Sequence, residues 1–191
     1  MKMFFIKYLV FISLFFSADL LASDEGGLSL MTQEMLSYDV EKGDKEITIT
    51  REMKPCGKNR GFLQPLVPAK GVTLVNEIDM LLAMNNPDVL IVDMRSAHFF
   101  YDETLPLAIN VPYTGVSLNL DELGCEEDKG KWDCTDAITS YIFCNGPACT
   151  QSPIGIREMI ELGFPVEKIY YYRGGMLVWS ALGLTTVKGE L

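Results

Sequence analysis

The sequence predicts an α/β domain with a small, mainly parallel sheet and helices on both faces, preceded by an N-terminal extension that contains a β-hairpin. Short apolar runs suited to buried strands recur along the chain, at 89–92, 108–112, 138–143 and 168–172. Segments suited to short helices lie between or after them. This alternation is typical of a parallel sheet, because each parallel connection needs a crossover.

Four short helices are expected around these strands. The first should include Val75, Ile78, Leu81 and Leu82 with Thr73 as its N-cap. The others are expected at 96–101, at 154–162 and at 176–182. For the third, Ser152 is the expected N-cap and Pro153 the first helical residue, and Gly163 ends it.

The first 23 residues have the features of a secretory signal peptide. Lys2 and Lys7 precede an apolar core, and small residues follow up to Ala22 and Ser23. The core is shorter than the ~20 residues that span a bilayer. We therefore expect cleavage near Ala22 or Ser23, a periplasmic or secreted protein, and no stable membrane anchor after cleavage.

The rest of the chain divides into an extension at 24–71 and a domain at 72–191. Within the extension, Gly43-Asp44 is a turn signal, and alternation in Glu46–Thr50 predicts a hairpin over 39–51. The chain has a net charge of −10 and no cluster of basic residues. Nucleic acid and anionic membrane surfaces are therefore disfavoured as partners.

The stretch around Cys144 carries the strongest signal for chemistry. An apolar strand ends on Cys144, a compact loop with Gly146, Pro147 and Cys149 follows, and a helix then begins. The helix N-terminus directs N–H groups and positive potential towards the Cys144 sulfur. We expect this field to lower the pKa of Cys144 and to make it a nucleophile.

The other cysteines predict a structural disulfide outside this loop. Cys125 and Cys134 flank a hydrophilic segment with a glycine turn, and we expect them to pair; two unrelated thiols or a metal pair are the alternatives. A zinc site is disfavoured because Cys-x2-Cys is absent and the chain has one histidine. We expect no metal and no cofactor. Cys56 is either free or close to the Cys144 loop.

Three motifs resemble, in the right order, the signatures of rhodanese-like domains. They are Asp93-Met94-Arg95 with Thr104 to Pro112, Cys144 after its strand, and Tyr172-Arg173-Gly174-Gly175-Met176 with Trp179 and Gly183. The loop Cys-Asn-Gly-Pro-Ala-Cys at 144–149 and the extension at 39–68 are similar to an exported, single-domain subgroup of that family.

The resemblance implies a sulfurtransferase. A loop cysteine, here Cys144, takes a sulfane sulfur from a small anionic donor such as thiosulfate and forms a persulfide. It then passes the sulfur to a thiol or to cyanide. Asp93, Arg95 and Arg173 are expected to support the site. The anion-binding loop is expected to comprise Asn145, Gly146, Ala148, Cys149, Thr150, Gln151 and Ser152.

The chain also departs from the family pattern. Its loop has no arginine, which disfavours phosphatase or arsenate reductase chemistry. Glu103 and Leu107 stand where the family usually has glycine. Cys149 is either a resolving thiol that closes a disulfide with Cys144 or a lining residue. The alternative function is a redox or sulfur-carrier module that uses this cysteine pair without thiosulfate turnover.

Overall fold

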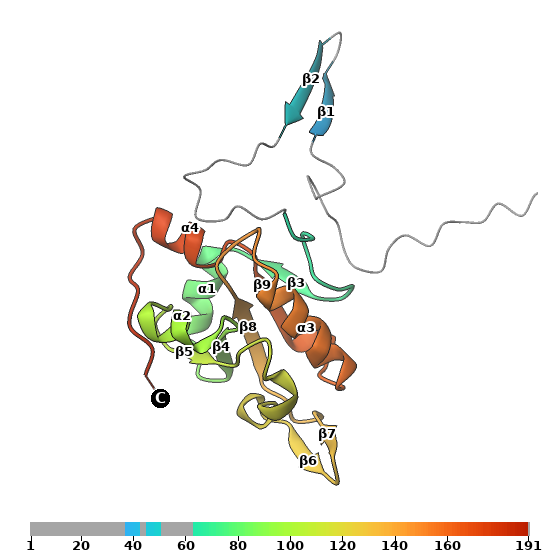
Figure 1. Cartoon of the computed structure of the whole chain (residues 1–191), viewed down its shortest axis with the longest axis vertical. Coiled ribbons are helices and arrows are strands. Elements are labelled where there is room, and N and C mark those ends of the chain that lie inside the picture. Colours follow the sequence, from blue (N-terminus) through green and yellow to red (C-terminus); the bar gives the residue numbers. More distant parts are fainter. Residues whose placement is uncertain (1–36, 43–44, 51–62, 191) are drawn as a thin grey trace, which may run out of the picture.

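The computed structural model describes residues 37–42, 45–50 and 63–190 and confirms the predicted α/β fold. Five strands form a parallel sheet in the order β3-β9-β8-β4-β5 (Figure 1). Their bounds are β3 Thr73–Val75, β4 Val89–Asp93, β5 Ala108–Asn110, β8 Thr139–Phe143 and β9 Ile169–Tyr172. The sheet brings the ends of β4, β8 and β9 side by side.

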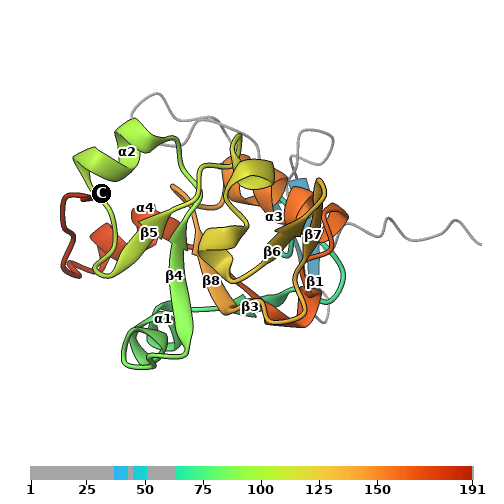
Figure 2. The same ribbon diagram turned by 90° about the horizontal axis from the view of Figure 1, so that it is seen from below.

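Helices cover both faces of this sheet (Figures 1 and 2). Helix α3 (Gln151–Glu161) packs on one face, whereas α1 (Glu77–Met84) and α4 (Gly175–Ala181) pack on the other. The short helix α2 (Ala97–Asp102) follows β4. Three single-turn 3-10 helices complete the domain: η1 Val116–Leu118, η2 Asp121–Leu123 and η3 Val166–Lys168.

Side chains of the central strands alternate between two hydrophobic clusters, as period-two strand geometry requires. Val92, Ile142 and Tyr171 lie in one register row and pack with Ile156 and Met159 of α3. Their neighbours Ile91, Phe143 and Tyr172 face the other cluster, with buried side chains from α1 and α4: Met80, Ala83, Met176 and Trp179. The sheet is therefore buried on both faces, which explains its continuous apolar runs.

Two antiparallel hairpins accompany the sheet. The predicted hairpin of the extension is present as β1 (Ser37–Lys42) paired with β2 (Lys45–Thr50). The second, β6 (Glu126–Asp128) with β7 (Lys131–Asp133), extends from the end of the domain opposite α4 (Figure 1). The predicted disulfide between Cys125 and Cys134 closes its base.

The predicted start of α1 was wrong. Thr73 lies in β3, where it pairs with Tyr170. Asn76 is the N-cap instead, since its side chain accepts hydrogen bonds from the Ile78 and Asp79 N–H groups. Ile78 and Leu82 are 61% and 66% exposed, whereas Met80 and Ala83 are buried. The pairing of the edge strand β3 with β9 moves the helix start by about one turn.

The start of α3 also differs from the prediction. The helix begins at Gln151, and Thr150 occupies the N-cap position without a side-chain capping bond. Ser152 is therefore the second helical residue, and Pro153 the third. Proline is tolerated there because the N–H groups of the first turn have no partner within the helix. Ser152 is fully buried, so its side chain belongs to the protein interior and does not cap α3.

The predicted signal peptide and Cys56 lie outside the described residues, as does most of the extension. Within the part of the chain that the structure describes, none of the helices combines the length and apolar character of a membrane span.

Candidate active site

The candidate site lies at the carboxyl ends of three adjacent strands. Asp93 ends β4, Cys144 follows β8 and Arg173 follows β9. Their strands are neighbours in the sheet, so residues about 30 to 80 positions apart meet at one edge. Crevices at this edge are the usual place for ligands in open α/β sheets.

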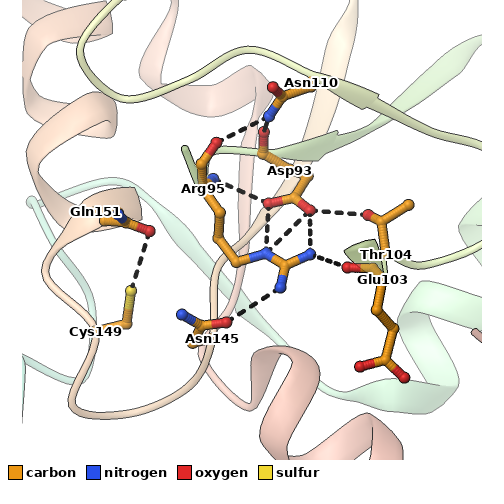
Figure 3. A network of polar contacts seen from close by, with 8 residues as sticks. All are labelled: Asp93, Arg95, Glu103, Thr104, Asn110, Asn145, Cys149 and Gln151. Carbon is orange, nitrogen blue, oxygen red and sulfur yellow. Dashed lines mark hydrogen bonds and ion pairs between the residues drawn. The ribbon is translucent and has the colours of Figure 1, made fainter. Parts of the chain in front are cut away.

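A buried ion pair between Asp93 and Arg95 anchors this edge (Figure 3). Arg95 Nε lies 3.0 and 3.1 Å from the two Asp93 oxygens, and Nη2 lies 2.6 Å from Oδ2. The Thr104 hydroxyl donates to the same Oδ2 at 2.8 Å. Arg95 Nη2 also donates to the Glu103 carbonyl. The charge of Arg95 is thus neutralised locally and its side chain is fixed.

Two asparagines connect this pair to the surrounding backbone and to the cysteine loop. Asn110 Nδ2 donates to the carbonyls of Asp93 and Arg95, at 2.8 and 2.9 Å. Arg95 Nη1 donates to Asn145 Oδ1 at 3.1 Å, across 50 residues of sequence (Figure 3). Arg95 therefore positions the residue that follows Cys144.

Helix α4 holds the first residues of the loop from the other side. The Met176 N–H donates to the Cys144 carbonyl at 3.0 Å, and the Leu177 N–H donates to the Asn145 carbonyl at 2.9 Å. A Cβ atom at Gly175 would overlap the Cys144 carbonyl oxygen. Gly175, in the third sequence motif, thus lets α4 approach the loop.

Cys144 is enclosed by this arrangement, with 1% of its surface exposed. Burial raises the pKa of the Cys144 thiol well above its ordinary value, and its hydrogen bond to Cys149 acts in the same direction. The Ser152 hydroxyl and N–H oppose this effect but do not reverse it. The expected low pKa of Cys144 was therefore wrong, because desolvation outweighs the helix N-terminus.

Cys149 has the opposite character and is the more exposed of the two thiols. The hydrogen bond from the Cys144 thiol is the largest influence that lowers the pKa of Cys149 to about 6. The N–H groups of Gln151 and Asn145 and the charge of Arg95 also favour its thiolate, against partial burial. Of these two thiols, Cys149 is the one that ionises near neutral pH.

The remaining loop residues take different positions. Gly146 is buried with a φ of 151°, and its carbonyl accepts the Cys149 N–H at 2.9 Å. Ala148 is partly buried, and Thr150 is exposed. The Gln151 side-chain oxygen accepts a hydrogen bond from the Cys149 thiol at 3.8 Å (Figure 3). The Gln151 side-chain nitrogen donates to the Ser96 hydroxyl at 3.3 Å. The Ser152 hydroxyl is buried without an ordinary hydrogen-bond partner.

Arg173 contacts the extension rather than the cavity beside the loop. Its Nη2 donates to the Gln64 carbonyl at 2.8 Å, and the Gln64 N–H donates to the Pro147 carbonyl at 2.8 Å. Burial lowers the pKa of Arg173. The described end of the extension is thus joined to the cysteine loop, and Arg173 stabilises that connection.

A cavity of about 560 Å³ opens beside the loop. Neither cysteine lines it, although Asn145 and Arg95 do. The cavity combines apolar side chains with two exposed carboxylates; its lining comprises Arg95, Phe99, Asp102, Glu103, Asn145, Met176, Leu177, Ser180 and Ala181. It can hold part of a substrate while the reacting atoms lie at its edge, near the loop.

The contacts of several residues at this site could not be identified from the sequence alone. Asn145 and Gly175 stand inside recognised motifs, but their contacts with Arg95 and Cys144 join segments far apart in the chain. Asn110 gives a weak signal, a polar residue at the end of a predicted strand. The link through Gln64 falls in a proline-rich loop without regular periodicity, where the sequence gives no signal.

The parallel sheet presents two free thiols on a strand-loop-helix turn. The family model of the rhodanese-like domain matches residues 78–182, which is more than half of the chain. The protein therefore belongs to the rhodanese-like domain family.

Solved structures with this fold are more distant. Protein BH2092 of Bacillus halodurans has 19% identity and a TM-score of 0.48, over 61% of this chain and 77% of that one. A thiosulfate sulfurtransferase of Pseudomonas aeruginosa has 21% identity and a TM-score of 0.47, over 62% of this chain and 21% of that one. A rhodanese with anions from Escherichia coli has 20% identity and a TM-score of 0.38, over 53% of this chain and 99% of that one. No curated protein matches the sequence significantly.

Proposed function

We propose that this protein is a sulfurtransferase that carries a persulfide on its Cys144–Cys149 loop. The observation that carries the proposal is the pair of free thiols beside the Arg95–Asn145 link, one of them with a pKa of about 6. A thiolate is the form that attacks a sulfane sulfur. Family membership supports the same class of reaction.

In the proposed reaction a loop thiolate attacks the outer sulfur of a donor of the thiosulfate type. The bond between that sulfur and sulfite breaks, and sulfite leaves with the electron pair. A thiol or cyanide then takes the outer sulfur and returns the loop cysteine to its thiolate. The resemblance to the family implies a persulfide on Cys144, where the buried Ser152 hydroxyl could donate a hydrogen bond to it.

The charges at the site bear on the choice of donor. The positive charge of Arg95 is paired with Asp93, and Asp102 and Glu103 add negative charge to the neighbouring cavity. A dianion such as thiosulfate gains little Coulomb attraction there. We therefore propose that persulfides of small uncharged or cationic thiols transfer sulfur faster than thiosulfate does.

We further propose that the protein works outside the cytoplasm, as a member of the exported subgroup that its loop resembles. The sequence features of Met1–Ser23 and the Cys125–Cys134 disulfide support an oxidising destination.

A redox module is the second candidate, favoured by the contact between the thiols. Cys144 donates to the Cys149 carbonyl at 3.7 Å, and a hydrogen bond between the two side chains influences both pKa values. Thiols in contact need little movement to form a disulfide if the Cα atoms approach within ~7 Å. In that function the loop would alternate between dithiol and disulfide without holding a sulfane sulfur.

Intact mass after incubation with a donor separates the two candidates. The purified protein, with its loop reduced, is mixed with thiosulfate or with cysteamine persulfide and then desalted. A gain of one sulfur atom, removed by cyanide with release of thiocyanate, supports sulfur transfer. A loss of two hydrogens, with no sulfur gained from either donor even in the single variants Cys144→Ser and Cys149→Ser, which cannot close the loop disulfide, would replace this proposal by the redox function. The variant Cys144→Ser/Cys149→Ser controls for sulfur bound at Cys56.

A further inference from the structure

The sulfur of Cys144 is covered by the loop that it begins. The thiol donates to the Cys149 carbonyl at 3.7 Å, and 1% of the residue is exposed. A sulfur donor or acceptor has to reach this sulfur, so the part of the loop that contacts it, residues 146–149, must first move away. The hydrogen bonds that hold residues 146–149 therefore decide how easily Cys144 is reached.

The two ends of the loop are held in different ways. Helix α4 donates to the first two carbonyls, and Arg95 Nη1 donates to Asn145 Oδ1, so the start of the loop is fixed. Within residues 146–149, Pro147 has no N–H group. Among the residues that the structure describes, one main-chain hydrogen bond ties these four residues to another segment. It runs from the Gln64 N–H to the Pro147 carbonyl, at 2.8 Å.

Gln64 is held from its other side by Arg173. The Arg173 Nη2 donates to the Gln64 carbonyl at 2.8 Å. The arginine is partly buried, its Nε has no hydrogen-bond partner, and no carboxylate of the described residues forms an ion pair with it. Loss of the Gln64 carbonyl would leave this cation with still fewer acceptors, which is costly for a partly buried charged group. Arg173 therefore keeps Gln64 against the loop.

The segment that presents Gln64 is anchored on the domain. In this entry segment (residues 63–72), Pro68 and Val72 are buried, and Ala69 packs against the hydrophobic cluster on the α3 face of the sheet. The segment leads directly into β3, which pairs with β9, the strand that Arg173 follows. Gln64 is thus positioned by the domain itself.

We propose that Gln64 holds the cysteine loop closed over Cys144, and that release of Gln64 opens the loop to reagents. Gln64 is a positioning residue that acts through the Pro147 carbonyl, and it does not touch the substrate. The inference rests on the proposed function in one respect, namely that Cys144 is the sulfur that has to be reached. It assigns control of that access to the entry segment, outside the three sequence motifs.

The rate of alkylation of Cys144 reports loop opening without any sulfur donor. In the background Cys56→Ser/Cys149→Ser, Cys144 is the one cysteine outside the structural disulfide. Gln64→Pro removes the N–H that donates to the loop, whereas Gln64→Ala keeps it. At one fixed, mildly alkaline pH, iodoacetamide should label Cys144 about three- to tenfold faster in Gln64→Pro, the factor expected for one net hydrogen bond. Gln64→Ala should stay near the background rate, and equal rates in the two variants would overturn the proposal.

Substitutions of Arg173 test the same connection from its other side and do not depend on the folding of Gln64→Pro. Arg173→Met removes the donor to the Gln64 carbonyl, whereas Arg173→Lys keeps a cationic donor. Cys144 should be labelled faster in Arg173→Met than in the background, with Arg173→Lys between the two. A background rate in Arg173→Met would show that Arg173 does not hold Gln64 against the loop.

Local opening of the loop has to be separated from a general loss of stability. Gly183→Ala supplies the control, because it strains the backbone at a residue with open space around it and with no contact to the loop. Labelling of Cys144 should stay near the background rate in this variant. A rate as high as in Gln64→Pro would mean that global unfolding exposes the thiol, and it would overturn the proposal. If the protein takes up no sulfur from any donor, the proposed function fails, but the labelling rates still test the role of Gln64.

Discussion

Gly175 lies so close to Cys144 that a single added methyl group would overlap the Cys144 carbonyl oxygen. The same atom would stand 2.8 Å from the Gly146 nitrogen, inside the loop. Gly175 also has a φ of 53°, in the left-handed region that favours glycine. The third sequence motif therefore shapes the cysteine loop through backbone contact, although none of its side chains needs to react.

Gly175→Ala should destabilise the protein by at least about 2 kcal/mol, since backbone strain and steric overlap add together. Gly183 provides the control, because its φ is 70° and open space surrounds it. Gly183→Ala should cost about 1 kcal/mol from strain alone. Urea denaturation gives both values. Equal losses would mean that the contact between Gly175 and the loop contributes nothing.

Replacing Leu107 by glycine should stabilise the protein. It has a φ of 63° and is 70% exposed, at a position where the family usually has glycine. Leu107→Gly should stabilise the protein by about 0.5–1 kcal/mol, because it relieves left-handed strain and uncovers little buried surface. Leu107→Ala keeps the strain and should give no comparable gain. Thermal unfolding of the three proteins would refute the explanation if alanine stabilised as much as glycine.

The sheet and the motif residues could be predicted from the sequence because they depend on local pattern. Continuous apolar runs gave four of the five parallel strands, and Asp93, Arg95 and Cys144 stand directly after such runs. β3 was missed because Thr73–Val75 becomes a strand only through pairing with β9. That distant pairing also displaced the expected cap of α1 from Thr73 to Asn76.

The ionisation of the two thiols could not be predicted from the sequence for a related reason. A cysteine before a helix N-terminus suggests a lowered pKa, but the burial of Cys144 depends on α4 and on the sheet behind it. The influence of Arg95 on Cys149 depends on the meeting of two strand ends, β4 and β8. Such effects arise from tertiary contacts and leave no periodic signal.

The Thr104 hydroxyl should contribute to stability through Asp93. It donates to the fully buried carboxylate at 2.8 Å, and hydrogen bonds to charged groups contribute about 1.5–3 kcal/mol. Thr104→Val removes this donor at nearly constant volume and should cost about that amount. Thr104→Ser keeps the hydroxyl and should cost about 1 kcal/mol, for the lost methyl group. Chemical denaturation that ranked serine as the worse substitution would contradict this role.

The Cys125–Cys134 disulfide should stabilise the domain although it lies apart from the cysteine loop. It closes a short loop with a sequence separation of 9. The chain-entropy relation gives a contribution of about 2.5–3 kcal/mol for such a loop. Cys125→Ser/Cys134→Ser should lower the free energy of unfolding by that amount. A reducing agent should then destabilise the wild-type protein but not the variant; equal sensitivity would place the effect elsewhere.

The pKa of Cys149 predicts a specific dependence of stability on pH. In the unfolded chain a cysteine titrates near its ordinary value of ~8.5, whereas folding lowers the pKa of Cys149 to about 6. Between these values the unfolded state binds more protons, so the contribution of Cys149 to stability is fully present above about pH 8.5. It is lost as the pH falls towards 6.

The unfolding free energy of wild type minus that of Cys149→Ser should therefore be larger at pH 8.5 than at pH 6. Cys144 has a raised pKa and remains protonated across this window in the folded state, so its own effect acts only at the alkaline end. A difference that is constant with pH would show that Cys149 is not ionised in the folded protein.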